Sequence, residues 1–178
     1  MPDITKIDKN LAASSNIESG DTEFYDITKA PFEIFGVMIP DGADDKFRRM
    51  PREVAESVSE GVAALHSNTA GGRIRFRTDS PYITIMVEMP EVCRFPHMPL
   101  TGTTGFDAYR TDGREQIYVG TFVPPNESER GYTAEIGGGF IGEGDYIINM
   151  PLYNDVSKVY IGIKKGAKLS QSISKYIN

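Results

Sequence analysis

Residues 69–87, TAGGRIRFRTDSPYITIMV, decide the fold class of this chain. In residues 73–78, RIRFRT, basic and apolar side chains alternate with a period of two, which is typical of a strand with one buried and one solvent-facing side. Residues 79–81 interrupt the run, because Asp and Ser favour side-chain turns and Pro lacks a backbone donor. Residues 82–87, YITIMV, resume the alternation. The stretch therefore predicts two β-strands joined by a tight polar turn.

The composition predicts one globular domain with many turns. A chain of 178 residues can bury about 70% of the surface of its unfolded state. Its 18 glycines and 11 prolines suit an all-β fold better than a helical bundle. The net charge of −6 argues against a nucleic-acid-binding protein, because affinity for phosphate requires an excess of Lys and Arg.

The cysteine count and the N-terminus bear on the cellular compartment. Cys93 is the single cysteine, so the chain forms no internal disulfide. Residues 1–10, MPDITKIDKN, lack the apolar core of a signal peptide, and no later run approaches the length of a membrane span. We therefore expect a cytoplasmic protein that does not contact a membrane.

Turn-forming residues divide the chain into short segments. We predict an N-terminal arm with a possible first strand at 1–23, a single β-sandwich domain at 24–168, and a tail or linker at 169–178. One short helix is predicted to begin at Pro51 and to end before Gly61. Besides the two central strands, we predict strands at 32–38, 105–109, 116–122, 132–136, 145–150 and 158–163. This pattern predicts an all-β, jelly-roll-like sandwich with at most one or two short helices.

No group of residues has the spacing of a catalytic or metal centre. His66, Cys93 and His97 do not form a closely spaced pair of metal ligands. Ser80 follows an aspartate, but a turn between strands offers no helix N-terminus for an oxyanion, so its side chain is expected to cap the turn. The glycines of 137–142 match a dinucleotide-binding spacing, but a strand rather than a helix follows them. We therefore predict no catalytic residue, no metal and no cofactor.

Arg73, Arg75 and Arg77 place three guanidinium groups on one face of a strand. One interpretation is a solvated face whose charges pair with Asp or Glu of a neighbouring strand, each pair contributing at most about 1 kcal/mol. The other is a docking or anion-binding surface, because the planar guanidinium group suits carboxylates. Tyr109 and Tyr153 also allow two interpretations, as core residues or as a platform on which a sugar stacks.

Several separated blocks together resemble one protein family. The blocks are FRRMP at 47–51, NTAGGRIRFRTDS at 68–80, HM at 97–98, GFDAY at 105–109, MPLYN at 150–154 and YIGI at 160–163. In order and spacing they resemble the N-terminal β-sandwich domain that precedes the catalytic domain in bacterial SGNH (GDSL-like) esterases and acylhydrolases. The resemblance implies that a C-terminal SGNH hydrolase domain of the same polypeptide is the partner of this domain.

The resemblance does not carry a catalytic centre into this chain. In that family the nucleophilic serine lies in a Gly-Asp-Ser block and the histidine in an Asp-x-x-His block, and neither block occurs in this sequence. The residues three positions before His66 and His97 are Ala63 and Arg94. We therefore expect this chain to be non-catalytic and the whole polypeptide to hydrolyse esters, with a carbohydrate ester as the implied substrate.

Two functions follow from these observations. The first is an accessory domain that docks on the hydrolase domain and shapes its substrate entrance. The second is an independent carbohydrate-binding module, which exposed tyrosines in a shallow groove would favour, whereas a flat apolar patch would favour docking. The candidate residues for binding or docking are Arg73, Arg75, Arg77, His97, Met98, Tyr109, Tyr153 and Asn154.

Overall fold

The structure is a computed structural model, and it describes residues 20–42, 45–112, 115–139 and 141–174. The predicted N-terminal arm therefore lies outside the described residues except for residues 20–23, and so do the last four residues of the predicted tail. None of the helices in the described part of the chain is long and apolar enough to span a lipid bilayer.

Strands dominate the structure. In chain order the elements are β1 (Thr22–Asp26), β2 (Glu33–Phe35), α1 (Arg52–Val58), α2 (Glu60–Leu65), β3 (Arg73–Thr78), β4 (Tyr82–Glu88), α3 (Leu100–Thr104), β5 (Phe106–Asp112), β6 (Glu115–Phe122), β7 (Gly131–Gly137), β8 (Gly144–Asn149), β9 (Lys158–Lys164) and β10 (Leu169–Ser170). Strand makes up 42% of the structure and helix 12%, which confirms the all-β prediction. The jelly-roll-like description of the sandwich stays a prediction.

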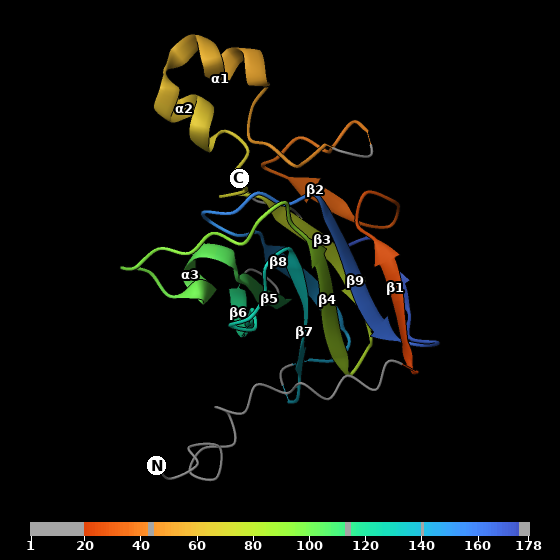
Figure 1. The fold of residues 1–178 in the computed structure, drawn as a ribbon. Helices are drawn as coiled ribbons and strands as arrows, with labels where there is room; N and C mark the ends of the chain where they lie inside the picture. The colour runs from red at the N-terminus through yellow and green to blue at the C-terminus, as the bar shows by residue number, and fades with distance from the viewer. Residues whose placement is uncertain (1–19, 43–44, 113–114, 140, 175–178) are drawn as a thin grey trace, which may run out of the picture.

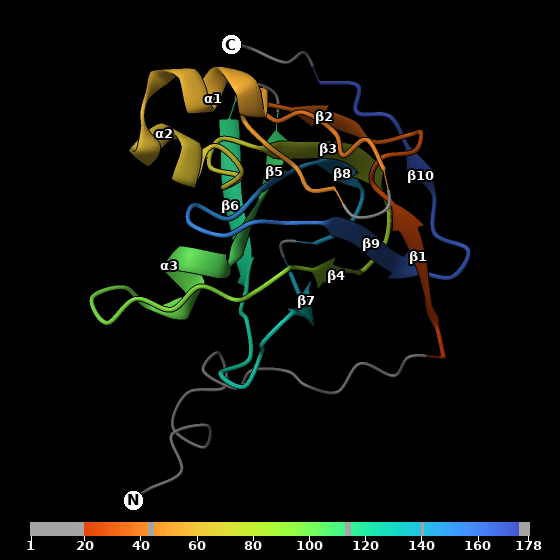
Figure 2. The same ribbon diagram turned by 45° about the horizontal axis from the view of Figure 1, so that its top comes forward.

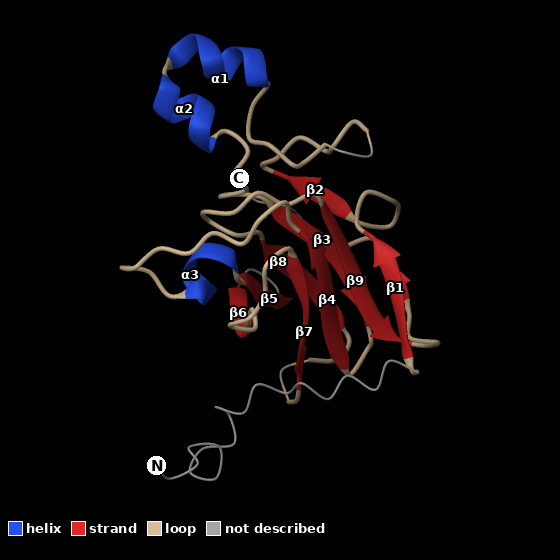
Figure 3. Ribbon diagram, in the orientation of Figure 1, coloured by secondary structure: helices blue, strands red, loops and turns tan. Residues whose placement is uncertain are grey.

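Two antiparallel sheets form the sandwich (Figure 1, Figure 3). The four-stranded sheet has the order β1-β9-β4-β7 and the larger sheet the order β10-β3-β8-β5-β6. β2 also pairs with β3, opposite residues 73–75, whereas β10 pairs opposite residues 77–78. The two short strands β2 and β10 therefore pair with successive parts of the same edge of β3.

The two central strands form as predicted, but they are not a hairpin. β3 belongs to the larger sheet and β4 to the four-stranded sheet, so residues 79–81 cross from one layer to the other. The Ser80 hydroxyl donates to the carbonyl of Tyr82 at 2.5 Å and accepts from the amide of Lys164 at 3.1 Å. Its predicted role as a cap of this turn is thereby confirmed, and the second bond ties the crossing to β9.

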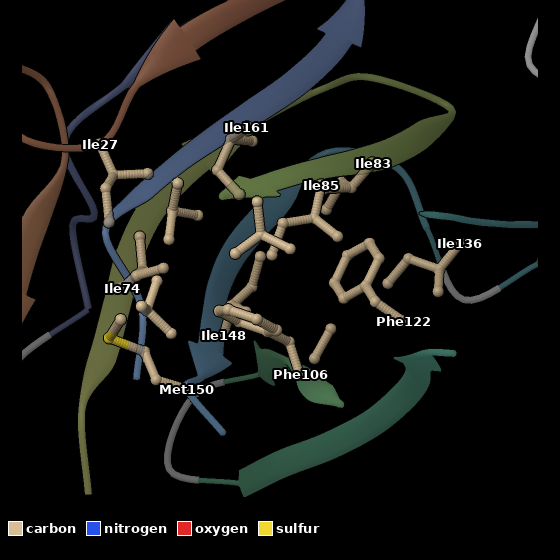
Figure 4. Close-up of a cluster of buried hydrophobic side chains, with 14 of the residues drawn as sticks. Ile27, Ile74, Ile83, Ile85, Phe106, Phe122, Ile136, Ile148, Met150 and Ile161 are labelled. Carbon is tan, nitrogen blue, oxygen red and sulfur yellow. The ribbon is translucent and has the colours of Figure 1, made fainter. Parts of the chain in front are cut away.

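Apolar side chains between the two sheets form the core. Ile74 and Phe76 of β3 face Ile83 and Ile85 of β4, and all four are completely buried. Figure 4 shows residues of both sheets meeting in this layer, together with Phe106 and Phe122. The buried faces that the alternating pattern predicted for both strands are therefore confirmed.

Three short helices lie outside the sheets, where at most two were predicted. The predicted helix after Pro51 forms as α1, but Ser59, in an extended conformation, separates it from α2. The Ser59 hydroxyl accepts a hydrogen bond from the amide of Val62 and so caps α2. Gly61, predicted to end the helix, instead lies within α2. The third helix, α3, had no prediction.

Arg75 does not lie on a solvated face, which was the first of the two interpretations of the three arginines. Its side chain is 3% exposed because residues 172–174 and Glu33 cover it. Arg77 fits the prediction better, since it pairs with Asp145 of the neighbouring strand β8 at 3.1 Å. These covering residues belong to the stretch 169–178 that was predicted as a tail, and they follow β10 directly.

Candidate functional site

A cleft of about 270 Å³ opens beside α3, at the end of the larger sheet where β3 begins. The loop before β3, the first turn of α3 and the segment after β8 form its walls. The lining residues are Gly71, Arg73, Thr101, Gly102, Gly105, Asp107, Asn149, Met150 and Leu152. Of the predicted candidates, Arg73 belongs to this lining.

A row of polar residues crosses the sheet at the base of the cleft. Arg73 of β3 lies opposite Asn149 of β8, and Asn149 lies opposite Asp107 of β5. Residues in register on neighbouring strands project from the same face, so the three side chains share one face of the larger sheet. The row extends to Thr121 of β6, whose hydroxyl donates to the Asp107 carboxylate at 2.7 Å.

These residue types suit a ligand rich in hydroxyl groups. A guanidinium group only donates hydrogen bonds, an ionised carboxylate only accepts them, and an amide does both. Arg73, Asn149 and Asp107 therefore offer donors and acceptors along one line of the cleft. Asp107 and Asn149 were absent from the predicted candidates, although Asp107 stands in the quoted block GFDAY.

Aromatic side chains form a rim next to this cleft. The Phe95 ring stacks on His97 at 5.7 Å between centroids and meets Tyr153 edge-on at 5.9 Å. Phe95 and Tyr153 are both exposed, the latter by 39%. We call Phe95, His97 and Tyr153 the aromatic rim.

Backbone and side-chain contacts attach the aromatic rim to the cleft. The Tyr153 amide donates to the carbonyl of Thr103 in α3 at 3.1 Å, and Leu152, the preceding residue, lines the cleft. Met98 packs over Gly102, where a methyl group on the glycine would come within 3.1 Å of the Met98 side chain. The structure thus brings together Arg73, residues 95–98 and Tyr153, which come from three separate parts of the sequence.

Asn154 was predicted to lie on a binding or docking surface, but the structure places it in the interior, where it supports the neighbouring loops. It is completely buried, and its side-chain oxygen accepts from the amide of Cys93 at 2.7 Å. Its amide group donates to the carbonyl of Glu91 at 2.9 Å. Asn154 therefore fixes the segment that leads to Phe95 against the turn that carries Tyr153.

The other three predicted residues lie elsewhere on the larger sheet. Arg75 is covered by the C-terminal segment, and Arg77 pairs with Glu143 and Asp145. Tyr109 meets Tyr118 edge-on at 5.6 Å on β5 and β6. The Tyr118 hydroxyl is hydrogen-bonded to Thr121, the same residue that donates to Asp107, so this pair of tyrosines adjoins the polar row.

The site has the chemistry of a binding surface. The candidate nucleophile Ser80 is completely buried and bonded to the backbone, and His66 is buried with Nδ1 against the carbonyl of Ala63. Among the residues that the structure describes, no group of three or more His, Cys, Asp or Glu could hold a metal ion. Neither Ser80 nor His66 belongs to the lining of the cleft.

The family of the chain follows from its match to the model GxDLY, described as the N-terminus of SGNH-hydrolase-type esterases, over residues 22–169. The chain belongs to this family. The letters of its name, Gly-x-Asp-Leu-Tyr, agree with residues 105–109 except at Ala108, and they include Asp107 of the polar row. In this family the domain is the N-terminal part of an esterase, so the predicted resemblance is confirmed.

Two solved structures have the same fold. A protein from Bacteroides ovatus described as a GDSL-like lipase is 18% identical with a TM-score of 0.74, over 88% of this chain and 45% of that one. The salicylyl-acyltransferase SsfX3 of a tetracycline biosynthetic pathway is 20% identical with a TM-score of 0.62, over 86% of this chain and 42% of that one. This chain thus spans less than half the length of either neighbour. No curated protein matches it.

Proposed function

We propose that this domain is a non-catalytic accessory domain that docks on the SGNH hydrolase domain of the same polypeptide. It shapes the entrance through which the substrate, a carbohydrate ester, reaches the active site. The observation that carries the proposal is the polar row Arg73–Asn149–Asp107 in an open cleft next to exposed aromatic rings. Sugars offer hydroxyl groups for such a row and an apolar ring face for an aromatic side chain.

The family supports the accessory role. A domain that forms the N-terminus of SGNH-type esterases has the hydrolase as its covalent neighbour. A cleft on this domain can therefore bind the part of a substrate that lies outside the catalytic centre, which lowers KM without supplying a chemical step.

The test uses the product of the whole gene and two substrates. Asp107→Asn removes a charged acceptor and is expected to raise KM about tenfold for an acetylated oligosaccharide, the effect of losing a hydrogen bond of about 1.4 kcal/mol. Hydrolysis of p-nitrophenyl acetate, which is too small to fill the cleft, should stay unchanged. Asp21→Asn, an exposed aspartate just before β1 in the other sheet, is the matched control.

Two results would contradict the proposal. If Asp107→Asn and Asp21→Asn have the same KM for the acetylated oligosaccharide as the wild type, the cleft does not bind substrate. If p-nitrophenyl acetate hydrolysis occurs with the 178-residue chain alone, the domain is itself catalytic.

The alternative function is an independent carbohydrate-binding module. The exposed Tyr118, which meets the partly buried Tyr109 edge-on, and the aromatic rim favour it, since both place rings near the polar row. Calorimetric titration of the 178-residue chain with unesterified oligosaccharides distinguishes the two functions. Binding that Tyr118→Ala abolishes, without any effect of this substitution on ester hydrolysis by the whole protein, would favour the module.

A further inference from the structure

The helical hairpin of α1 and α2 buries very little within the described residues. α1 contributes one buried side chain, Ala55, and α2 contributes none. Helices of seven and six residues are too short to be stable by themselves in water and depend on the packing of an apolar face. The two helices contact each other, and Figure 1 and Figure 3 show them at one end of the sandwich, away from both sheets.

Three apolar side chains of this hairpin are exposed. Val54 and Val58, one turn apart on α1, are 49% and 63% exposed, and Leu65 of α2 is also exposed. Exposed Met38 and Ile39 extend the apolar side chains beyond the helices. We call these five residues the hairpin surface.

Backbone hydrogen bonds connect the parts of the hairpin surface. The amide of Met38 donates to the carbonyl of Arg48 at 2.7 Å. The next residue, Arg49, donates its amide to the carbonyl of His66 at 2.8 Å and its guanidinium group to the carbonyl of Leu65 at 2.5 Å. Met38 and Leu65 are therefore attached to adjacent residues of one segment.

The C-terminal segment runs toward the same end of the sandwich. β10 is antiparallel to β3, with Leu169 opposite Thr78, and Ser174 lies at Arg75. The segment thus proceeds toward Arg73, where the chain from α2 enters β3. Figure 2 shows it passing along β2 toward the helices.

We propose that the hairpin surface is the docking site for the SGNH hydrolase domain that follows this domain in the family, an inference that rests on the function proposed above. More than half of each structural neighbour lies outside the part matched by this chain, so a large partner is present in such proteins. In the described residues the chain runs from β10 toward the end of the sandwich that carries the hairpin surface, so a domain that follows this one would start on that side. Arg73 of the cleft lies at this end too, so the docked hydrolase domain borders the cleft.

The test is made on the product of the whole gene. The double variant Val54→Asp, Val58→Asp places two charges in the docking site and is expected to speed protease cleavage after Ser174 about tenfold, because an undocked hydrolase domain leaves this segment open. Val123→Asp is the matched control, since Val123 follows β6 and has the same 49% exposure as Val54. Cleavage of the control should match the wild type.

A second measurement needs no variant. Hydrogen exchange of residues 52–65 is expected to be at least about tenfold slower in the whole protein than in the 178-residue chain, because docking covers the hairpin. Equal exchange in both, or equal cleavage of the double variant, the control and the wild type, would overturn the proposal. So would a double variant that changes from dimer to monomer without faster cleavage, since a second copy would then cover the surface.

Neither readout uses ester hydrolysis. Failure of the docking proposal therefore leaves the KM test of the cleft intact, and failure of that KM test leaves the docking result intact.

Discussion

Replacing Arg75 is expected to release the C-terminal segment from the sandwich. The guanidinium group donates to the Ser172 hydroxyl at 3.0 Å and to the Ser174 carbonyl at 2.5 Å, and it lies 3.8 Å from the Glu33 carboxylate. Arg75→Met keeps an apolar stem of similar length and removes the donors. The segment then loses its hydrogen bonds to β3 beyond β10.

The size of the effect follows from these contacts. Hydrogen bonds to a charged group contribute about 1.5–3 kcal/mol net, and the Arg75 side chain is 3% exposed, so solvent screens it little. A loss of about 2–3 kcal/mol raises the population with an open segment by about 30- to 150-fold, at 1.4 kcal/mol per factor of ten. Opening of the segment leaves the core between the sheets intact.

Hydrogen exchange of the Ile173 amide measures this opening. In the closed state this amide donates to the Asp145 carboxylate at 2.9 Å, so its exchange rate follows the open population. Arg94→Met is the matched control, because Arg94 also donates to two backbone carbonyls but lies in the loop before α3. Exchange of Ile173 in Arg75→Met within twofold of the wild type would refute the reasoning.

Three further predictions concern the supports of the site. Asn154→Ala leaves buried groups without partners and should lower the free energy of unfolding by about 3 kcal/mol, which corresponds to a fall in Tm of about 6–12 °C. The exposed control Asn126→Ala should change the free energy of unfolding by less than about 0.5 kcal/mol. Burial raises the pKa of Asp155, but hydrogen bonds from Lys46 and two neighbours outweigh it and lower that pKa below its usual value. The free energy with which this carboxylate stabilises the fold is thus fully present above about pH 3.9 and is lost as the pH falls further. The free energy of unfolding, measured in urea, should therefore depend less on pH below about pH 4 in Asp155→Asn than in the wild type, and an equal dependence in both would contradict this. Burial raises the pKa of Tyr132, so its neutral phenol stabilises the fold below about pH 10 and this contribution declines at higher pH. The free energy of unfolding of Tyr132→Phe should therefore vary less with alkaline pH than that of the wild type. An identical pH dependence in the two proteins would exclude this role.

The sequence predicted those elements whose signal is local. Alternation in 73–78 and 82–87 identified both strands and their buried faces, and these predictions hold in β3 and β4. The turn chemistry of Ser80 was also predictable, because its hydroxyl bonds a residue two positions away. The same local pattern predicted a tight turn between the strands but did not show that β4 joins the opposite sheet, since a turn sequence does not reveal which sheet the next strand enters.

The candidate site could be predicted only in part. Arg73, His97, Met98 and Tyr153 were chosen from the sequence and lie at or beside the cleft. Asp107 was missed as an individual residue because its importance comes from its register with β8, which no local spacing reveals. The block GFDAY, which the family name also spells, was the signal that could have identified it.

The sequence by itself determined the all-β class, the strands with their inward faces, and the membership of a family of esterase N-termini, because these depend on period, turn residues and the order of short blocks. The tertiary structure alone decided what covers each outward face. The alternation 73–78 directs Arg73, Arg75 and Arg77 to one side of β3, but the cleft, the C-terminal segment and a carboxylate of β8 give the three identical side chains different surroundings. Those neighbours come from segments up to about a hundred positions away, and pairing in a sheet is the physical step that brings them together.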